Sequence, residues 1–298
     1  MTTQEAHSSP AASRDQTLRL GDGRALGFAE LGDPRGRPVF HFHGNPGCRL
    51  ERWDVGQNEG ERGIRLITVD RPGIGLSDAS PERSVADWAD DVAELADHLG
   101  HERFAVVGYS LGGPYAAACA AKLTNRVVAA GLVSADARVD DISVVEQVAT
   151  ARYFKLARRA PWAMALIYAI VGRTARRNPQ AAHRLFFQGF PNIDRAIADR
   201  PEVSSRIMAE LAEAIRPGAR GLVDDMRRAQ RPWGFEPESI AVPVHLWQGR
   251  ADSVVPPSHG EYWMNAVADC RATFLEGEGH MLIEDRAVEV FEAVAAHL

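Results

Sequence analysis

The sequence has few cysteines and no metal-binding pattern, which argues against stabilisation by disulfide bonds or by a bound metal. Its three cysteines, Cys48, Cys119 and Cys270, are scattered over 298 residues, and no two of them form a Cys-x-x-Cys pair. No helix-spaced pair of histidines accompanies them. We therefore expect neither a disulfide framework nor a metal site, and no cofactor.

Positive charge and long apolar runs are also scarce. The chain has 34 Lys and Arg against 40 Asp and Glu, a net charge of -6 at pH 7, so we expect no nucleic-acid partner. The most apolar helical stretch, 162–171, is too short to cross a bilayer, which predicts no membrane span. The basic residues beside it, Arg158, Arg159 and 173–177, are expected to form a solvated helix face.

The order of apolar runs predicts an α/β fold. Residues 1–16 are polar and lack the apolar stretch of a secretory signal, which predicts a disordered tail and a cytoplasmic protein. From Thr17 onward short apolar runs alternate with helical patterns, as in a mostly parallel, eight-stranded sheet with helices on both faces. Strands are expected at 24–29, 39–43, 65–69, 104–108, 127–133, 242–247 and 272–275, and helices at 85–99, 111–122 and 283–297.

Residues 138–239 interrupt this alternation and have helical patterns throughout. Asp141 is expected to cap one helix, and Asn178-Pro179 to begin another with Pro at its first position. A further helix is expected at 203–215, where apolar residues recur four apart. We interpret the chain as a core of residues 17–137 and 240–298 into which a helical cap, residues 138–239, is inserted.

One motif predicts a catalytic nucleophile. Gly108-Tyr-Ser110-Leu-Gly112 follows an apolar strand and precedes a helix of small residues. Glycines on both sides of Ser110 allow a tight turn that holds its hydroxyl exposed above the sheet. The sequence therefore predicts Ser110 as a nucleophile.

A serine hydroxyl needs a base to take its proton, and the base needs an orienting acid. His280 lies in a glycine-containing loop just after the last expected strand. Asp252 follows the strand at 242–247, and Asp136 follows the strand that ends near Val133. We assign His280 as the base and Asp252 as the acid, with Asp136 as the alternative.

The negative charge that develops on the substrate oxygen needs backbone donors. The N–H of Leu111 lies at the start of a helix, directly after the serine. The loop His43-Gly44-Asn45-Pro46-Gly47 follows another strand. Because Pro46 has no N–H, Asn45 is the expected second donor, and His43 is expected to be structural.

Together these residues resemble the α/β-hydrolase superfamily, in its branches with a helical cap that are similar to epoxide hydrolases and proline iminopeptidases. The turn Asp70-Arg71-Pro72-Gly73 belongs to the resemblance and is expected to be architectural. Serine at position 110, where dehalogenases and epoxide hydrolases have aspartate, argues against those two chemistries. The elbow sequence and Asn45 also depart from the iminopeptidases, which argues against peptidase activity.

The resemblance implies a cofactor-free serine hydrolase of the carboxylesterase type. We expect it to cleave an ester, thioester or lactone of a small to medium hydrophobic substrate through an acyl-enzyme. Alternatives are a carbon–carbon bond hydrolase or a biosynthetic lyase or transferase on the same triad, and a ligand-binding receptor with little turnover. A homodimer is a possible assembly. The residues expected to contact substrate are Tyr109, Trp162, Tyr168, Phe187 and Met281.

Overall fold

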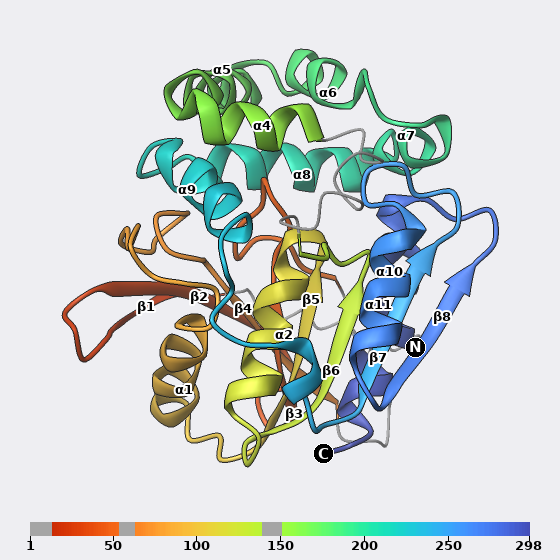
Figure 1. Ribbon diagram of the computed structural model, residues 1–298. Coiled ribbons are helices and arrows are strands. Elements are labelled where there is room, and N and C mark those ends of the chain that lie inside the picture. The colour runs from red at the N-terminus through yellow and green to blue at the C-terminus, as the bar shows by residue number, and fades with distance from the viewer. Residues whose placement is uncertain (1–13, 54–62, 139–150) are drawn as a thin grey trace, which may run out of the picture.

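The computed structural model describes residues 14–53, 63–138 and 151–298. These ranges contain one eight-stranded sheet, whose strands lie side by side in the order β1-β2-β4-β3-β5-β6-β7-β8 (Figure 1). The pairs β1–β2 and β2–β4 are antiparallel, and all other neighbours are parallel. The strands are β1 (Arg14–Arg19), β2 (Ala25–Gly32), β3 (Arg37–Phe42), β4 (Ile64–Val69), β5 (Phe104–Tyr109), β6 (Val127–Val133), β7 (Val244–Gly249) and β8 (Cys270–Leu275).

This architecture confirms the expected α/β-hydrolase fold, but the chain begins its sheet earlier than predicted. Residues 14–16 belong to β1, so their assignment to a disordered tail is wrong. β1 is an edge strand of mostly polar residues, Arg-Asp-Gln-Thr-Leu-Arg, and its backbone pairs with β2 from Arg14↔Glu30 to Arg19↔Ala25. Backbone pairing at a sheet edge needs no apolar alternation, so composition gave no signal for it.

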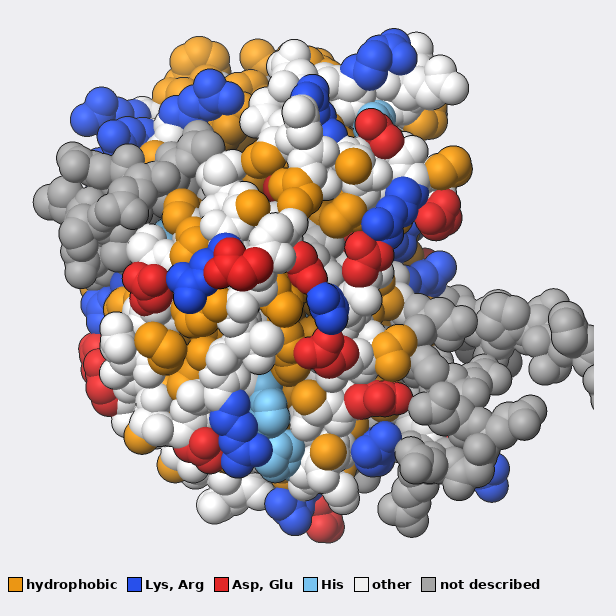
Figure 2. All heavy atoms as spheres, turned by 90° about the vertical axis from the view of Figure 1, so that its right-hand side faces the viewer, with side chains coloured by type: hydrophobic (Ala, Val, Ile, Leu, Met, Phe, Trp, Pro, Cys, Tyr) orange, Lys and Arg blue, Asp and Glu red, His pale blue; other side chains and the backbone are white. Residues whose placement is uncertain are grey.

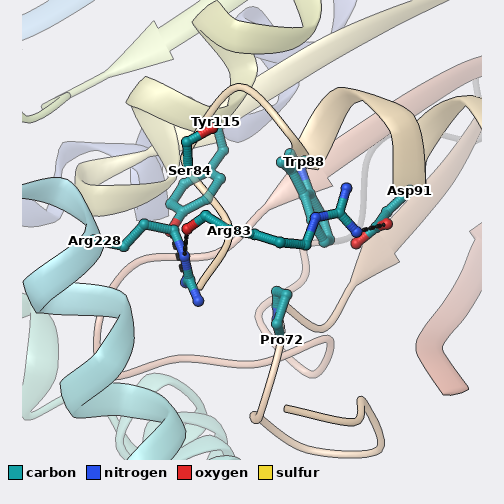
Figure 3. Close-up of a pocket in the computed structure, with 7 residues that line it drawn as sticks. All are labelled: Pro72, Arg83, Ser84, Trp88, Asp91, Tyr115 and Arg228. Carbon is teal, nitrogen blue, oxygen red and sulfur yellow. Dashed lines mark hydrogen bonds and ion pairs between the residues drawn. The ribbon is translucent and has the colours of Figure 1, made fainter. Parts of the chain in front are cut away.

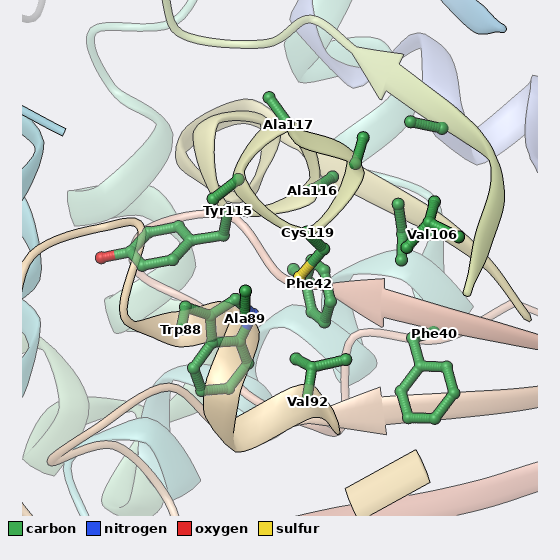
Figure 4. Close-up of a cluster of buried hydrophobic side chains, with 14 of the residues drawn as sticks. Phe40, Phe42, Trp88, Ala89, Val92, Val106, Tyr115, Ala116, Ala117 and Cys119 are labelled. Carbon is green, nitrogen blue, oxygen red and sulfur yellow. The ribbon is translucent and has the colours of Figure 1, made fainter. Parts of the chain in front are cut away.

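Two groups of helices bury the two faces of the sheet. On one face lie α1 (Trp88–His98), α2 (Gly113–Lys122) and α10 (Pro257–Ala266); on the other lies α11 (Ile283–Ala295). Successive strand residues point to opposite faces, so Phe40 packs with α1 and α2 while its neighbour Val39 packs with α11. Figure 4 shows part of the first cluster, in which the side chain of Cys119 lies beside the ring of Phe42 and the rings of Phe42 and Trp88 are 5.5 Å apart between centroids. Helix α10 was not predicted from the sequence.

Within the described ranges, six further α-helices follow β6 and precede β7, and they lie over one end of the sheet (Figure 1). These six helices are called the cap below. The first residue of α6 is Pro179, and the side chain of Asn178 accepts a hydrogen bond from the N–H of Ala181 at 3.0 Å, as predicted for this helix start. Asp141 lies outside the described residues. The six helices are α4 (Ala151–Arg159), α5 (Pro161–Arg177), α6 (Pro179–Phe187), α7 (Asn192–Ala198), α8 (Pro201–Ala214) and α9 (Arg220–Ala229).

Candidate active site

Ser110 lies at the sharp turn between β5 and α2. Its φ of 52° is a value that residues with side chains rarely adopt, and its exposed fraction is 8%. A Cβ added at Gly108 would overlap the carbonyl oxygen of Gly112, and one added at Gly112 would overlap the carbonyl oxygen of Phe42. The serine is therefore held at a strained position by a turn in which strand and helix approach more closely than larger residues allow.

His280 and Asp252 form a buried pair. Nδ1 of His280 lies 2.9 Å from Oδ2 of Asp252. The other oxygen, Oδ1, accepts the N–H groups of Val254 at 2.9 Å and Val255 at 2.8 Å. These two backbone bonds fix the carboxylate in the loop after β7, so that it faces the imidazole in the loop after β8.

The pair changes the proton affinity of the imidazole. Burial disfavours the charged ring, but the charge of Asp252 and its hydrogen bond outweigh burial and raise the pKa of His280 above its ordinary value. The ring also lies against Tyr109, with 5.1 Å between the ring centroids. The carbonyl oxygen of His280 accepts hydrogen bonds from the hydroxyls of Tyr109 at 3.3 Å and Ser134 at 3.2 Å.

Asp136, the alternative acid, does not bond to His280. Asp136 Oδ1 instead lies 3.9 Å from Nδ1 of His259, which accepts the N–H of Ala137 at 2.9 Å. Burial raises the pKa of Asp136 to about 7. Of the two carboxyl groups, the structure brings Asp252 to the imidazole.

Two polar atoms of the site have no hydrogen-bond partner within the described ranges. They are the hydroxyl oxygen of Ser110 and Nε2 of His280. The backbone of the turn is nevertheless tied down, because the carbonyl oxygen of Ser110 accepts the N–H of Asp136 at 3.1 Å. Catalytic hydrogen bonds are often long in free enzymes and shorten when substrate binds, so this geometry is compatible with a nucleophile and its base.

The loop from His43 to Gly47 is held by Arg71. The guanidinium donates to the carbonyl oxygens of His43 and of Gly44, the latter at 3.1 Å. The N–H of Arg71 also lies 3.3 Å from Nε2 of His43, whose Nδ1 lies 2.7 Å from the Gly44 oxygen. This network makes Nδ1 the protonated nitrogen of a neutral ring, which agrees with burial lowering the pKa of His43 well below its usual value.

Fixing the Gly44 carbonyl also fixes the N–H of Asn45. Both groups belong to one trans peptide unit, in which the C=O and N–H point in opposite directions. Because the oxygen points at Arg71, the hydrogen points away from it. The N–H of Asn45 has no acceptor in the part of the chain that the structure describes.

The side chain of Asn45 is bound by the cap. Its amide nitrogen donates to the carbonyl oxygen of Leu222 at 3.0 Å and to Asp225 at 2.9 Å, both on α9. Its oxygen accepts the hydroxyl of Tyr168, on α5, at 2.7 Å. The asparagine therefore connects this loop to two helices of the cap, which glycine at this position could not do.

Asp225 is the residue that sequence reasoning missed. It is fully buried and bonds to Arg71 through both oxygens, with Nε–Oδ1 of 3.1 Å and Nη2–Oδ2 of 2.7 Å. Although burial opposes ionisation, Arg71 holds the pKa of Asp225 below its usual range. One signal for it was available in the sequence. Asp225 lies on the same face of α9 as Leu222 and Met226, and a carboxylate on a buried apolar face indicates a buried partner of opposite charge.

The network continues below Asp225. Its Oδ1 accepts the hydroxyl of Tyr115 at 2.6 Å, and Arg228 donates to that hydroxyl at 3.3 Å (Figure 3). The neighbouring cavity in Figure 3, which Tyr115, Arg228 and Trp88 help to line, has a volume of about 10 Å³. That is room for about one water molecule, so this cavity is not a substrate pocket.

A second buried carboxylate connects the cap to the histidine loop. Asp194, on α7, accepts the N–H of Met281 at 2.9 Å, and burial raises its pKa. Its other oxygen is buried without a partner in the described ranges. A Cβ at Gly279 would overlap the carboxylate of Asp194, so glycine is required directly before His280.

The five residues predicted to contact substrate do not all lie near Ser110 and His280. Tyr109 lies against His280 and Tyr168 against Asn45, as described above, whereas Phe187 and Met281 are buried together in a cap cluster. The prediction for Trp162 is wrong: its side chain is 73% exposed on the outer face of α5. Helix α5 is apolar on nearly all sides, so the sequence pattern could not show which face is buried.

In ranges 14–53, 63–138 and 151–298, no group of three or more His, Cys, Asp or Glu side chains could hold a metal ion. Within the same ranges, no helix has the length and apolar character needed to cross a membrane.

Comparison with known proteins agrees with this fold. The model of the α/β hydrolase fold family matches residues 37–287, and the chain belongs to this family. A Mycobacterium tuberculosis protein is 27% identical over 237 residues, which cover 77% of this chain and 66% of that protein. The chain thus spans slightly less than two thirds of that relative's length.

Two further similarities are informative. A proline iminopeptidase of Xanthomonas citri is 32% identical over 114 residues, or 35% of this chain and 34% of that protein. A thermophilic esterase from Thermogutta terrifontis superposes with a TM-score of 0.65 at 22% identity, covering 96% of this chain and 97% of the esterase. The first covers only about a third of each chain, and the second supports the fold.

Proposed function

We propose that this protein is a serine hydrolase that cleaves ester bonds through an acyl-enzyme. The observation that carries the proposal is the buried Asp252–His280 pair in the loops after β7 and β8, together with the strained turn after β5 that holds Ser110. In open α/β sheets, catalytic groups gather outside the carboxyl ends of parallel strands. The Thermogutta terrifontis esterase, similar over 96% of this chain, gives further support.

In the proposed first half-reaction, Oγ of Ser110 attacks the carbonyl carbon of the ester and its proton passes to Nε2 of His280. Asp252 keeps the imidazole in the tautomer with a proton on Nδ1 and stabilises the imidazolium. When the tetrahedral intermediate collapses, the C–O bond of the ester breaks. The leaving alcohol takes the proton from His280, and an acyl-serine remains.

In the second half-reaction, water attacks the acyl-serine while His280 again takes the proton. The carboxylic acid leaves, and the proton returns to Ser110. The N–H groups of Asn45 and Leu111 stabilise the negative charge on the substrate oxygen in both halves. Each such donor is worth about 3 kcal/mol in the transition state.

Arg71 is a positioning residue in this proposal. It orients the peptide between Gly44 and Asn45, and its charge polarises that peptide so that the N–H becomes a stronger donor. Asp225 neutralises the buried guanidinium and binds the Asn45 side chain. The cap thereby helps to set the oxyanion donor.

The apolar surroundings support a hydrophobic substrate. Leu111 belongs to a buried cluster with Met164 and Tyr168 of α5 and with Leu222 and Met226 of α9. Apolar walls with a few fixed polar groups are typical of small-molecule sites. We therefore propose small to medium acyl esters as substrates.

Pre-steady-state kinetics with p-nitrophenyl esters of increasing acyl length test this proposal. Because p-nitrophenol is a good leaving group, acylation should be faster than deacylation, and an acyl-enzyme mechanism then predicts a burst of one p-nitrophenol per active site, followed by slower turnover. Ser110→Ala should abolish both, whereas Ser239→Ala, at an exposed serine, should change neither. A burst that survives Ser110→Ala would overturn the proposal, and faster cleavage of a β-diketone or of a prolyl anilide than of any ester would indicate the carbon–carbon hydrolase or the peptidase instead.

A further inference from the structure

The outer helices of the cap carry positive charge without any negative charge. Between Ala151 and Ile193 the sequence has seven arginines and one lysine, and neither Asp nor Glu. Since this segment carries +8 and the whole chain -6, the other residues together carry -14. All eight cations are exposed, and none forms an ion pair with another described residue: Arg152, Lys155, Arg158, Arg159, Arg173, Arg176, Arg177 and Arg184.

Helix α5 presents an apolar row to solvent between these cations. Trp162, Leu166 and Ile170 are exposed by 73%, 52% and 49%. They are four residues apart, so their side chains lie above one another on one face and extend over about 12 Å. The opposite face of the helix, with Met164 and Tyr168, is buried in the cap.

This row is part of a larger concentration of exposed apolar side chains. Eight large hydrophobic residues are exposed in the described ranges, and five of them lie on α5 and α6. These five are the three residues of the row together with Ile167 and Leu185. Figure 1 places α5 on the side of the cap farthest from the sheet, and Figure 2 shows orange apolar and blue cationic side chains together along that upper edge. Scattered exposed residues need no explanation, but a concentration of this kind marks an interaction surface.

The charges are placed at both ends of the apolar row. Arg158 and Arg159 end α4 directly before α5, and Arg173 and Arg177 continue the exposed face of α5 beyond Ile170. The result is an exposed helix face with an apolar centre between two cationic ends, on the outside of the molecule. Exposed tryptophan and aliphatic side chains enter the interface of a membrane, and neighbouring arginines are attracted to anionic lipids.

We propose that this surface, formed by α5 with the adjoining ends of α4 and α6 and here called the cap face, docks the protein onto an anionic lipid bilayer. Tryptophan, leucine and isoleucine side chains would enter the headgroup region, while the arginines bind lipid phosphates. A second copy of the chain is a poorer occupant. A two-fold contact through this surface would oppose eight cations, none of them ion-paired within the described ranges, with eight more.

Vesicle binding tests the proposal directly. The full chain should bind phosphatidylcholine vesicles that contain phosphatidylglycerol, and should not bind phosphatidylcholine alone, at about 0.1 M salt. Trp162 supplies a built-in reporter, because the other described tryptophans are buried or half-buried. Its emission should shift to the blue on anionic vesicles, and brominated lipids should quench it.

Matched variants separate the cap face from other surfaces. Arg173→Gln with Arg177→Gln should weaken binding about 25-fold, at about fivefold for each cation near the membrane. The control pair, Arg103→Gln with Lys122→Gln, removes two exposed cations at the opposite end of the sheet and should leave binding unchanged. Arg176 is left in place because it donates to the carbonyl oxygen of Ala212.

For the apolar part, Trp162→Ser should weaken binding, whereas Val288→Ser, at a 45% exposed residue on α11, should not. Circular dichroism verifies that each variant is folded. No binding to phosphatidylglycerol vesicles would overturn the proposal, as would equal loss in the test and control variants. Two other results would also overturn the proposal. One is dimerisation through the cap face, and the other is tight binding of duplex DNA or an acidic protein without binding of vesicles; each would identify a different partner for this surface.

Discussion

Replacing Asp252 by asparagine should disable the site without disturbing its shape. Oδ1 of Asp252 accepts two backbone N–H groups, from Val254 and Val255, and Oδ2 faces Nδ1 of His280. In Asp252→Asn the amide oxygen must stay with the two N–H donors, since turning the amide would leave both buried donors facing an NH2 group. The NH2 group therefore points at Nδ1 and selects the tautomer with a proton on Nε2, which cannot accept the proton of the serine.

The size of the loss follows from the same contacts. Restoring the productive tautomer would leave two buried N–H groups unpaired, at about 1–3 kcal/mol each. The imidazolium also loses its neighbouring carboxylate. Together these costs amount to about 5 kcal/mol, which corresponds to a decrease of about 10⁴-fold in kcat, as in other triads.

Steady-state hydrolysis of a p-nitrophenyl ester measures this effect. Asp136→Asn is the control, because Asp136 is buried near His280 but does not bond to it. It should retain activity within about tenfold of the unmodified protein. An Asp252→Asn variant as active as the control would refute the reasoning, and a greater loss in Asp136→Asn would show that Asp136 is the acid.

Three further predictions follow from the site. Because Asp252 raises the pKa of His280 and catalysis needs the neutral ring, kcat/KM should fall as pH decreases through a midpoint above the ordinary histidine value, measured as a pH–rate profile. Arg71→Lys keeps a buried cation but cannot bond to the loop carbonyls and the carboxylate together, so kcat should fall about 10- to 100-fold with little change in KM. Gly112→Ala should lower the free energy of unfolding by about 1–3 kcal/mol in urea denaturation, because the new Cβ overlaps the carbonyl oxygen of Phe42.

Each of these has a result that contradicts it. A rate that is constant down to about pH 4 would exclude a histidine base. An increase in KM alone for Arg71→Lys would indicate a role in substrate binding rather than in orienting the Asn45 peptide. Gly189→Ala is the control for Gly112→Ala, because its new Cβ meets only the end of the Arg152 side chain, at 3.8 Å. Equal destabilisation by both substitutions would show that close packing at the turn after Ser110 does not cause the loss of stability.

The local part of the site could be predicted from the sequence. The glycines around Ser110 restrict the chain to a tight turn, and a histidine and an aspartate directly after parallel strands must lie at the same edge of the sheet. Backbone direction alone therefore places these groups near one another. The same reasoning identified the Asn45 loop, which follows β3.

The interactions between core and cap could not be predicted in this way. Arg71 and Asp225 are 154 residues apart in the sequence, and only the packing of α9 on the core brings them together. Trp162 shows the same limit, because a helix that is apolar on nearly all sides gives no signal for which face is buried. Edge strand β1 was missed because its stability depends on backbone pairing with β2 rather than on an apolar pattern.

The central claim is that Ser110 is a nucleophile activated by His280. A fluorophosphonate probe, followed by intact-mass measurement and peptide mapping, tests it most directly. We predict one phosphonyl adduct per chain, located on Ser110, absent in Ser110→Ala and strongly slowed in His280→Ala. An unlabelled protein, or an adduct on any other residue, would contradict the account.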